Sequence, residues 1–285
     1  MQDNYFNGLN SRGFHRLHYT DRGDPRNPRA VICVHGLTRN CRDFDTLAEA
    51  LQKDLRVVCV SIAGRGKSDW LPNAEDYSYP QYTADMTALI ARITATGASD
   101  LAWIGTSMGG MLGMLLAARP NTPIRRLVLN DIGAVVPKES MARIGQYTGK
   151  DPRFGSYAEM EQCVRTVSAP FGPLTDAQWQ HLTKYNSKQH ADGRWGMNYD
   201  PAIALSFRAA TDKDIVLWKY YDAVSCPTLL LRGEQSDVLP RDVAMEMTKR
   251  GPHPRMIEFA GIGHAPALMA DDQIAAVREF LLRNP

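Results

Sequence analysis

The stretch from Leu101 to Pro120 constrains the fold of this chain more than any other part of the sequence. It begins with an apolar run, passes through the pattern Gly105-x-Ser107-x-Gly109, and continues into residues rich in alanine, leucine and methionine. An apolar run before a tight turn and helix-forming residues after it predict a strand, a sharp turn and a helix. The two glycines are expected where strand and helix cross too closely for side chains. The sequence therefore places Ser107 at the apex of the turn, in strained backbone.

The same stretch suggests a chemical role for the serine. A helix that begins directly after Ser107 would direct its free backbone N–H groups, and the positive end of its dipole, at negative charge forming beside the serine oxygen. The glycine–serine–glycine pattern also occurs by chance in many proteins, so its strand-and-helix context is the stronger argument. We interpret Ser107 as a candidate nucleophile, which requires a base and an acid from elsewhere in the chain.

Apolar runs alternate with helical stretches on both sides of this turn. The sequence predicts strands over 13–23, 30–34, 56–61, 101–105, 126–131, 227–233 and 255–260. It predicts helices over 43–53, 78–97, 108–119, 240–250 and 271–282. The first strand alternates in the manner of a sheet edge, whereas later strands are apolar throughout, as in strands covered on both faces. This order predicts an α/β fold with a mostly parallel sheet between two layers of helices.

The alternation stops between about residues 134 and 210. Helices are expected there over 138–147, 156–167 and 175–188, with no convincing strand between them. The segment is dense in aromatic residues: Tyr147, Phe154, Tyr157, Phe171, Trp179, Trp195 and Tyr199. Most of these should pack inside the segment, and a few, among them Trp179 and Trp195, should face a ligand. We predict a core made of 1–133 and 211–285, and a helical insertion over 134–210 that covers the C-terminal edge of the sheet.

Charge and composition exclude several classes of partner. The chain has 33 basic and 31 acidic residues, and its net charge of +2 gives no general field for nucleic acid or a membrane surface. No apolar stretch approaches the roughly 18–20 residues that cross a bilayer, and the N-terminus lacks a basic region followed by an apolar run. The five cysteines have no C-x-x-C spacing, which favours reduced thiols. A cytoplasmic monomer or homodimer with a small-molecule ligand is expected.

Two features that suggest a bound nucleotide or metal are rejected on spacing. Residues 66–68, Gly-Lys-Ser, match the end of a phosphate-binding loop, but Ser61 stands where the first glycine is required. His15 and His18 lie an odd number of positions apart on a predicted strand, so their side chains point to opposite faces and cannot share a metal. No cofactor and no metal ion are therefore predicted.

Two strand ends supply partners for Ser107. Asp237 follows one predicted strand, and His264 follows the next one along the chain. Parallel strands place their carboxyl ends at one edge of the sheet, where open α/β folds have their sites. His264 is the predicted base and Asp237 the predicted acid that orients it, while Asp131, at the end of another strand, is the alternative acid.

With these residues in this order, the chain resembles the α/β-hydrolase-fold enzymes over nearly its whole length. Five motifs carry the resemblance, and each follows a predicted element: His35-Gly36, Gly64-x-Gly66-x-Ser68-Asp69, GTSMGG around Ser107, GEQSD ending at Asp237, and GIGH ending at His264. Serine rather than aspartate at position 107 argues against the dehalogenase and epoxide-hydrolase branches. The resemblance implies that the segment 134–210 is the family's cap domain.

The resemblance also assigns supporting roles near the serine. It implies an oxyanion hole made of two backbone N–H groups, those of Met108 and Leu37. It makes His35 a structural support for the loop that carries Leu37. Arg39 and Asn40 are candidates for substrate binding at the pocket mouth, with loop residues facing water as the alternative.

The predicted reaction is acyl transfer to water through an acyl-serine intermediate. The aromatic insertion favours a carboxylesterase acting on small to medium apolar acyl or aryl groups. A carbon–carbon hydrolase of ring-cleavage dienones is the alternative, because Ser-Met-Gly-Gly turns are common in that branch, although residues 35–38 lack its glycine-rich oxyanion loop. A non-catalytic ligand receptor on the same fold is a third hypothesis, which the intact serine, acid and histidine disfavour.

Overall fold

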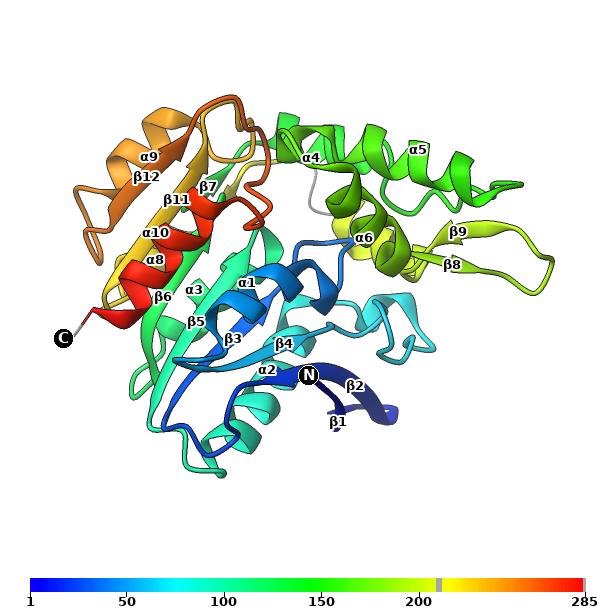
Figure 1. Cartoon of the computed structure of the whole chain (residues 1–285). Coiled ribbons are helices and arrows are strands. Elements are labelled where there is room, and N and C mark those ends of the chain that lie inside the picture. The colour runs from blue at the N-terminus through cyan, green and yellow to red at the C-terminus, as the bar shows by residue number, and fades with distance from the viewer. Residues whose placement is uncertain (209–211, 284–285) are drawn as a thin grey trace.

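The computed structural model describes residues 1–208 and 212–283, which contain an eight-stranded sheet (Figure 1). The strands lie side by side in the order β1 (Gln2–Asn10), β2 (Gly13–Arg22), β4 (Arg56–Val60), β3 (Arg29–Val34), β5 (Asp100–Thr106), β6 (Ile124–Asn130), β11 (Thr228–Gly233) and β12 (Arg255–Phe259). The strands from β4 to β12 in this order pair in parallel, whereas β1 and β2 pair antiparallel to their neighbours. The predicted α/β fold with a mostly parallel sheet is confirmed.

The edge of the sheet differs from the prediction. The sequence predicts the edge strand over 13–23, but β2 lies between β1 and β4, so β1 forms the edge. β1 is a polar segment with little apolar alternation, and its register runs from Gln2 opposite Asp21 to Asn10 opposite Gly13. Pairing with β2, rather than a pattern of its own, therefore makes this segment a strand.

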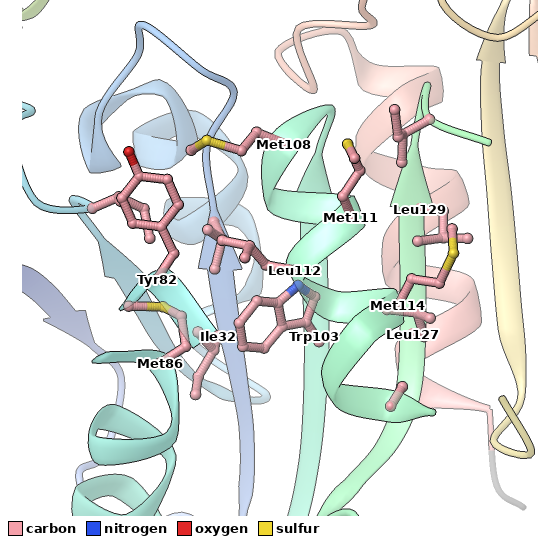
Figure 2. Packing of buried hydrophobic residues seen from close by; sticks show 14 of the residues in the cluster. Ile32, Tyr82, Met86, Trp103, Met108, Met111, Leu112, Met114, Leu127 and Leu129 are labelled. Atoms are coloured by element: carbon pink, nitrogen blue, oxygen red, sulfur yellow. The ribbon is translucent and has the colours of Figure 1, made fainter. Parts of the chain in front are cut away.

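Helices cover both faces of the sheet. One face carries α2 (Tyr79–Thr94), α3 (Met108–Ala117), α8 (Trp218–Tyr221) and α9 (Arg241–Met247), and the other carries α1 (Asp45–Leu51) and α10 (Asp271–Leu282). Figure 2 shows part of the larger core on the first face, to which Trp103 from β5, Leu112 from α3 and Met86 from α2 belong. All three side chains are fully buried, so the serine turn between β5 and α3 rests on a rigid base.

Residues 135–216 lie between β6 and β11, two strands that are neighbours in the sheet, and we call them the insertion. The insertion contains β7 (Val135–Val136), α4 (Lys138–Gly145), α5 (Tyr157–Val167), α6 (Asp176–Asn186), β8 (Ser187–Gln189), β9 (Trp195–Met197), α7 (Ala204–Arg208) and β10 (Ile215–Val216). In Figure 1 its helices α4, α5 and α6 lie beyond one end of the parallel strands.

The three helices predicted in this segment are present, with ends that differ by a few residues. The prediction that it holds no strand is wrong, because β8 pairs with β9 and β7 with β10. Strands of two or three residues carry no readable periodicity, so only the folded chain reveals them. The predicted boundary between residues 210 and 211 lies outside the described residues, and the division into two domains stays a prediction.

Side-chain caps explain where the main helices begin. The Ser78 hydroxyl accepts a hydrogen bond from the Gln81 N–H at the start of α2, and Ser156 does the same for the Glu159 N–H at α5. At α6, Thr175 and Gln178 form a reciprocal capping box. Such caps satisfy first-turn N–H groups that have no partner inside the helix. Within residues 1–208 and 212–283, no helix is long and apolar enough to cross a membrane.

Candidate active site

Ser107 lies at the sharp turn between β5 and α3. Its backbone has φ 52° and ψ −117°, a conformation that costs energy for a residue with a side chain. A Cβ at Gly105 would collide with the Gly109 carbonyl, and a Cβ at Gly109 would collide with the Val34 carbonyl of β3. The two glycines flanking the serine are therefore required by the close crossing of strand and helix.

Buried contacts hold this turn in place. The Trp103 indole N–H donates to the Gly109 carbonyl at 3.0 Å, and the Ser107 N–H donates to the Asn130 carbonyl at 3.0 Å. The Met111 N–H in turn donates to the Ser107 carbonyl, closing the first turn of α3. Because the backbone is bonded on both sides of the apex, the strained serine cannot relax by a local shift.

His264 bridges Ser107 and a buried carboxylate. Its Nε2 lies 2.9 Å from the Ser107 hydroxyl oxygen, and its Nδ1 lies 2.7 Å from a carboxylate oxygen of Asp131. The Asp131 side chain is 0% exposed and that of His264 is 12% exposed. An ionised carboxylate can only accept, so Nδ1 carries the proton and Nε2 accepts from the serine hydroxyl. This is the arrangement in which a histidine can take a proton from serine.

Asp131 is oriented by the chain around it. The Gly233 N–H donates to one of its carboxylate oxygens at 2.9 Å, and the Ser236 hydroxyl donates to the other at 2.6 Å. The Asp131 backbone has φ 55°, which turns the side chain from the end of β6 toward His264. Three donors, including Nδ1 of His264, thus converge on one buried carboxylate.

The prediction that Asp237 orients His264 is wrong, because the Asp237 side chain is not hydrogen-bonded to the histidine. The Asp237 carboxylate instead accepts two hydrogen bonds from the Arg143 guanidinium of α4, at 2.6 Å and 2.9 Å. Ser236 occupies the inward position of the loop after β11, and the next residue, Asp237, faces the insertion. Asp131, the alternative acid, takes the position beside the histidine. Asp131 and Asp237 both follow strands that end at the same edge of the sheet, so the conformation of the loop after β11 determines which carboxylate faces His264.

The loop after β3 passes beside the serine. A Cβ at Gly36 would lie 3.7 Å from the Ser107 Cβ, and Leu37 follows it in the wall of the same pocket. His35 holds this loop: its Nδ1 lies 2.6 Å from the Gly36 carbonyl, and its Nε2 accepts from the Ile62 N–H at 3.0 Å. Complete burial lowers the pKa of His35 to about 3, so the ring stays neutral and can make both bonds.

A pocket opens above Ser107 and His264, walled on one side by the loop after β3. Its other walls come from the insertion, through eight residues that line it: Arg143, Ile144, Tyr147, Val167, Ser168, Pro170, Phe171 and Met197. The lining combines apolar surface with two guanidinium groups, Arg39 and Arg143. Both guanidinium groups are paired with an aspartate, Arg39 with Asp43 and Arg143 with Asp237, so the pocket can hold a small organic molecule with one polar end.

The predicted binding residues divide into one that lines this pocket and three that do not. Arg39 lines it, with its guanidinium paired to Asp43 at 2.7 Å. Asn40 instead caps the short helix Cys41–Phe44 and donates to the Tyr185 carbonyl, so its side chain is used within the fold.

Trp179 and Trp195 belong to the insertion's own core. Trp179 packs with Met160, Val164 and Leu182 between α5 and α6. Trp195 lies against the Tyr157 ring, with the ring centroids 4.9 Å apart. Their predicted contact with a ligand in the Ser107 pocket is wrong, because internal packing of α5, α6 and β9 uses these side chains.

Sequence reasoning missed Arg143 as a pocket residue. It lies on the polar side of an amphipathic helix, and exposed arginines of this kind are common, so no local signal distinguishes it. Tyr147 and Phe171 are members of the predicted aromatic set, but the sequence does not say which members face the serine. Among residues 1–208 and 212–283, no three His, Cys, Asp or Glu side chains cluster as a metal site.

Comparisons with known proteins agree with the fold. The family model of the α/β hydrolase fold matches residues 29–269. A 3-hydroxybutyrate-oligomer hydrolase from Cupriavidus necator is 44% identical over 280 residues, covering 95% of this chain and 94% of that protein. The mouse sn-1-specific diacylglycerol lipase ABHD11 is 33% identical over 91% of this chain and 82% of its own length. An X-ray crystal structure of a protein from Rickettsia typhi superimposes with a TM-score of 0.92 and 31% identity, covering 100% of both chains.

Proposed function

Because this chain is a hydrolase that belongs to the α/β-hydrolase family, we propose that it is a serine esterase which cleaves carboxylic esters through an acyl-Ser107 intermediate. One observation carries the proposal: Asp131, His264 and Ser107 form a continuous chain of hydrogen bonds, of 2.7 Å and 2.9 Å, at the floor of a pocket. A serine hydroxyl is a weak nucleophile at neutral pH, and this chain of contacts is what activates it.

The proposed reaction has two halves. In the first, the Ser107 oxygen bonds to the ester carbonyl carbon while its proton moves to Nε2 of His264, and Asp131 stabilises the resulting imidazolium. His264 then gives the proton to the leaving alcohol oxygen as the carbon–oxygen bond breaks, which leaves an acyl-serine. In the second half, a water molecule attacks that acyl group with His264 again as the base, and the free acid and Ser107 are regenerated.

We further propose that the backbone N–H groups of Met108 and Leu37 form the oxyanion hole. Met108 is the first residue of α3, where N–H groups point along the helix axis toward the serine oxygen. Leu37 lies in the loop beside the serine that His35 anchors. Two donors aimed at the tetrahedral intermediate typically contribute about 100- to 1000-fold in rate each.

The insertion would act as a cap, since it contributes much of the wall above Ser107. Its position supports a substrate of limited size. A second, apolar cavity of about 230 Å³ shares Leu37 with the serine pocket and is lined by three tyrosines, Tyr77, Tyr79 and Tyr82. This cavity lies beside the proposed oxyanion hole, where the apolar part of an acyl group would be found.

The substrate class we propose is a short ester of a hydroxy acid with a free carboxylate. Two observations support it: the arginines Arg39 and Arg143 both line the Ser107 pocket, and the relative from Cupriavidus necator is named for cleaving 3-hydroxybutyrate oligomers. Such oligomers are linear esters that end in a carboxylate. Each of these arginines is paired with an aspartate, and a guanidinium, with five N–H donors, can bind a second carboxylate through charge-assisted hydrogen bonds from its remaining N–H groups.

A substrate series tests the proposed function. We expect hydrolysis of p-nitrophenyl acetate and butyrate, of 3-hydroxybutyrate dimer and trimer, and no cleavage of a ring-cleavage dienone, measured by absorbance and by acid release. The cap and the small pocket predict that kcat/KM falls for acyl chains much longer than butyrate. Faster turnover of the dienone than of every ester would instead support the carbon–carbon hydrolase, and no turnover of any substrate would support the receptor hypothesis.

Replacing Arg143 with glutamine tests the role proposed for the guanidinium groups. For the 3-hydroxybutyrate dimer we expect KM to rise about 10-fold with kcat nearly unchanged, because one charge-assisted hydrogen bond to the carboxylate is lost. The methyl ester of the same dimer, which has no charge, should keep its KM. Arg194→Gln is the matched control, since Arg194 pairs with Asp192 on an exposed loop of the insertion. Equal changes in KM for the acid and its methyl ester would contradict carboxylate recognition by Arg143.

A further inference from the structure

Arg65 is a buried charge that the proposed mechanism does not use. It belongs to the loop after β4, between Gly64 and Gly66, and its side chain is 0% exposed. In the part of the chain that the structure describes, no carboxylate oxygen lies within 4.0 Å of its guanidinium nitrogens. A buried guanidinium without a carboxylate partner is costly, so other contacts must offset the cost of burying Arg65.

The contacts of Arg65 are carbonyl oxygens, a hydroxyl, a sulfur and aromatic rings. Its Nη1 donates to the Ala63 carbonyl at 2.6 Å and to the Tyr82 hydroxyl at 2.9 Å. The guanidinium carbon lies 5.1 Å from the centroid of the Tyr82 ring and 5.8 Å from that of the Tyr77 ring. These partners hold the group in place but leave its positive charge unneutralised.

Two further contacts connect Arg65 to the proposed oxyanion hole. Its Nε donates to the Leu37 carbonyl at 2.9 Å, and its Nη2 lies 3.8 Å from the sulfur of Met108. Figure 2 shows the Met108 side chain directed from the start of α3 toward Tyr82, another partner of this guanidinium. Arg65 thus contacts both residues whose N–H groups are proposed to bind the oxyanion, through the Leu37 carbonyl and the Met108 side chain, and it is not among the residues that line the Ser107 pocket.

The neighbourhood of Arg65 contains few groups that could cancel its charge. His35 stays neutral, because burial lowers its pKa and the positive charge of Arg65 acts in the same direction. The Asp200 carboxylate accepts from the Tyr77 hydroxyl at 2.6 Å and forms no ion pair with Arg65, whose guanidinium carbon lies 5.8 Å from the centroid of the same Tyr77 ring. The charge therefore acts on the oxyanion region through a medium of low polarity, where electrostatic effects are strong.

We propose that Arg65 is a positioning residue for the oxyanion hole: it fixes the Leu37 loop and supplies a permanent positive charge behind the two N–H donors. This inference rests on the proposed serine esterase mechanism. The ground-state ester carbonyl carries little charge, whereas the tetrahedral intermediate carries a full negative charge on oxygen. The Arg65 charge therefore stabilises the intermediate more than the bound substrate, and this difference accelerates the reaction.

Arg65→Met and Arg65→Lys test the proposal with p-nitrophenyl butyrate and with a trifluoromethyl ketone, which forms a charged tetrahedral adduct with an active serine. For Arg65→Met we expect kcat to fall about 100-fold, in the range seen on losing one oxyanion donor, with KM within 3-fold of the unsubstituted protein. The inhibition constant of the ketone should rise by a similar factor. Arg65→Lys keeps the charge but only part of the hydrogen bonding, so smaller parallel losses of about 10-fold are expected.

Arg126→Met is the matched control, because Arg126 is also buried but pairs with Asp100 at the start of β5, the end of the strand remote from Ser107. It should lower the melting temperature without changing kcat or ketone affinity. If Arg65→Met does not fold, the lysine variant decides the question: a loss of kcat without a matching loss of ketone affinity overturns the proposal. Unchanged kcat and ketone affinity in folded Arg65→Met also overturn it.

The unsubstituted protein separates the failure of this inference from the failure of the proposed function. If it neither hydrolyses esters nor binds the ketone, both the esterase mechanism and the role of Arg65 that rests on it are refuted. If it does both, and folded Arg65→Met behaves identically, only the role of Arg65 is refuted.

Discussion

Replacing Ser107 with alanine is expected to lower kcat for p-nitrophenyl butyrate by about 10⁶-fold, the loss seen when the nucleophile of such a site is removed. The acyl-serine cannot form without the hydroxyl oxygen, and His264 then has no proton to accept at this position. The proposed oxyanion donors and the pocket stay intact, so a small residual rate above that in water should persist.

Covalent labelling provides an independent measurement on the same variant. A fluorophosphonate should modify the unsubstituted protein at Ser107, identified by peptide mass, and should leave Ser107→Ala unlabelled. Thermal unfolding of both proteins checks that the loss is chemical and not structural. Hydrolysis by folded Ser107→Ala at a rate close to the original would contradict the proposed nucleophile.

The second large effect is expected at Asp131, and a matched substitution at Asp237 serves as its control. Asp131→Asn should lower kcat by about 10⁴-fold, because an amide can donate to Nδ1 and stabilise the wrong tautomer of His264. Asp237→Asn should change kcat less than about 3-fold, since Asp237 contacts Arg143 instead of the histidine and exposed ion pairs contribute little. Steady-state kinetics of the two variants distinguishes the two acids directly.

The opposite result, in which Asp237→Asn is the damaging variant, would contradict the assignment of Asp131 as the acid. A severe loss in Asp237→Asn with near-normal Asp131→Asn would show that the loop after β11, which carries Asp237, rearranges when substrate binds. Asp131 is also bonded to Gly233 and Ser236, so its asparagine variant should be checked for a lower melting temperature. Kinetics measured well below that temperature then reports on the histidine and not on unfolding.

Much of the fold can be predicted from the sequence because parallel strands and the helices between them have strong local patterns. Buried strands such as β3 and β4 are continuously apolar, and α2 has both a serine cap and apolar residues at helical spacing. β1 and the short strands of the insertion have no such pattern. Their backbone hydrogen bonds form only with partners elsewhere in the chain, so the sequence does not reveal them.

The residues of the candidate site also differ in how well the sequence predicts them. Ser107 and its glycine neighbours can be identified locally, because a tight crossing of strand and helix excludes side chains at those positions. The choice of acid cannot, because Asp131 and Asp237 both follow strands that end at one edge of the sheet. The wall of the pocket is least predictable, since Trp179 and Phe171 look alike in sequence but only Phe171 lines it.

The α/β fold, the turn that presents Ser107 and the histidine beside it can be predicted from the sequence, because each depends on neighbours a few residues away or on the order of strands. The partners are known only from the folded chain: Asp131 for His264, Arg143 for Asp237, and the buried Arg65 for Leu37 and Met108. Hydrogen bonds and ion pairs of this kind act over a few ångströms between residues far apart in the chain. Only the folded chain brings them within that distance.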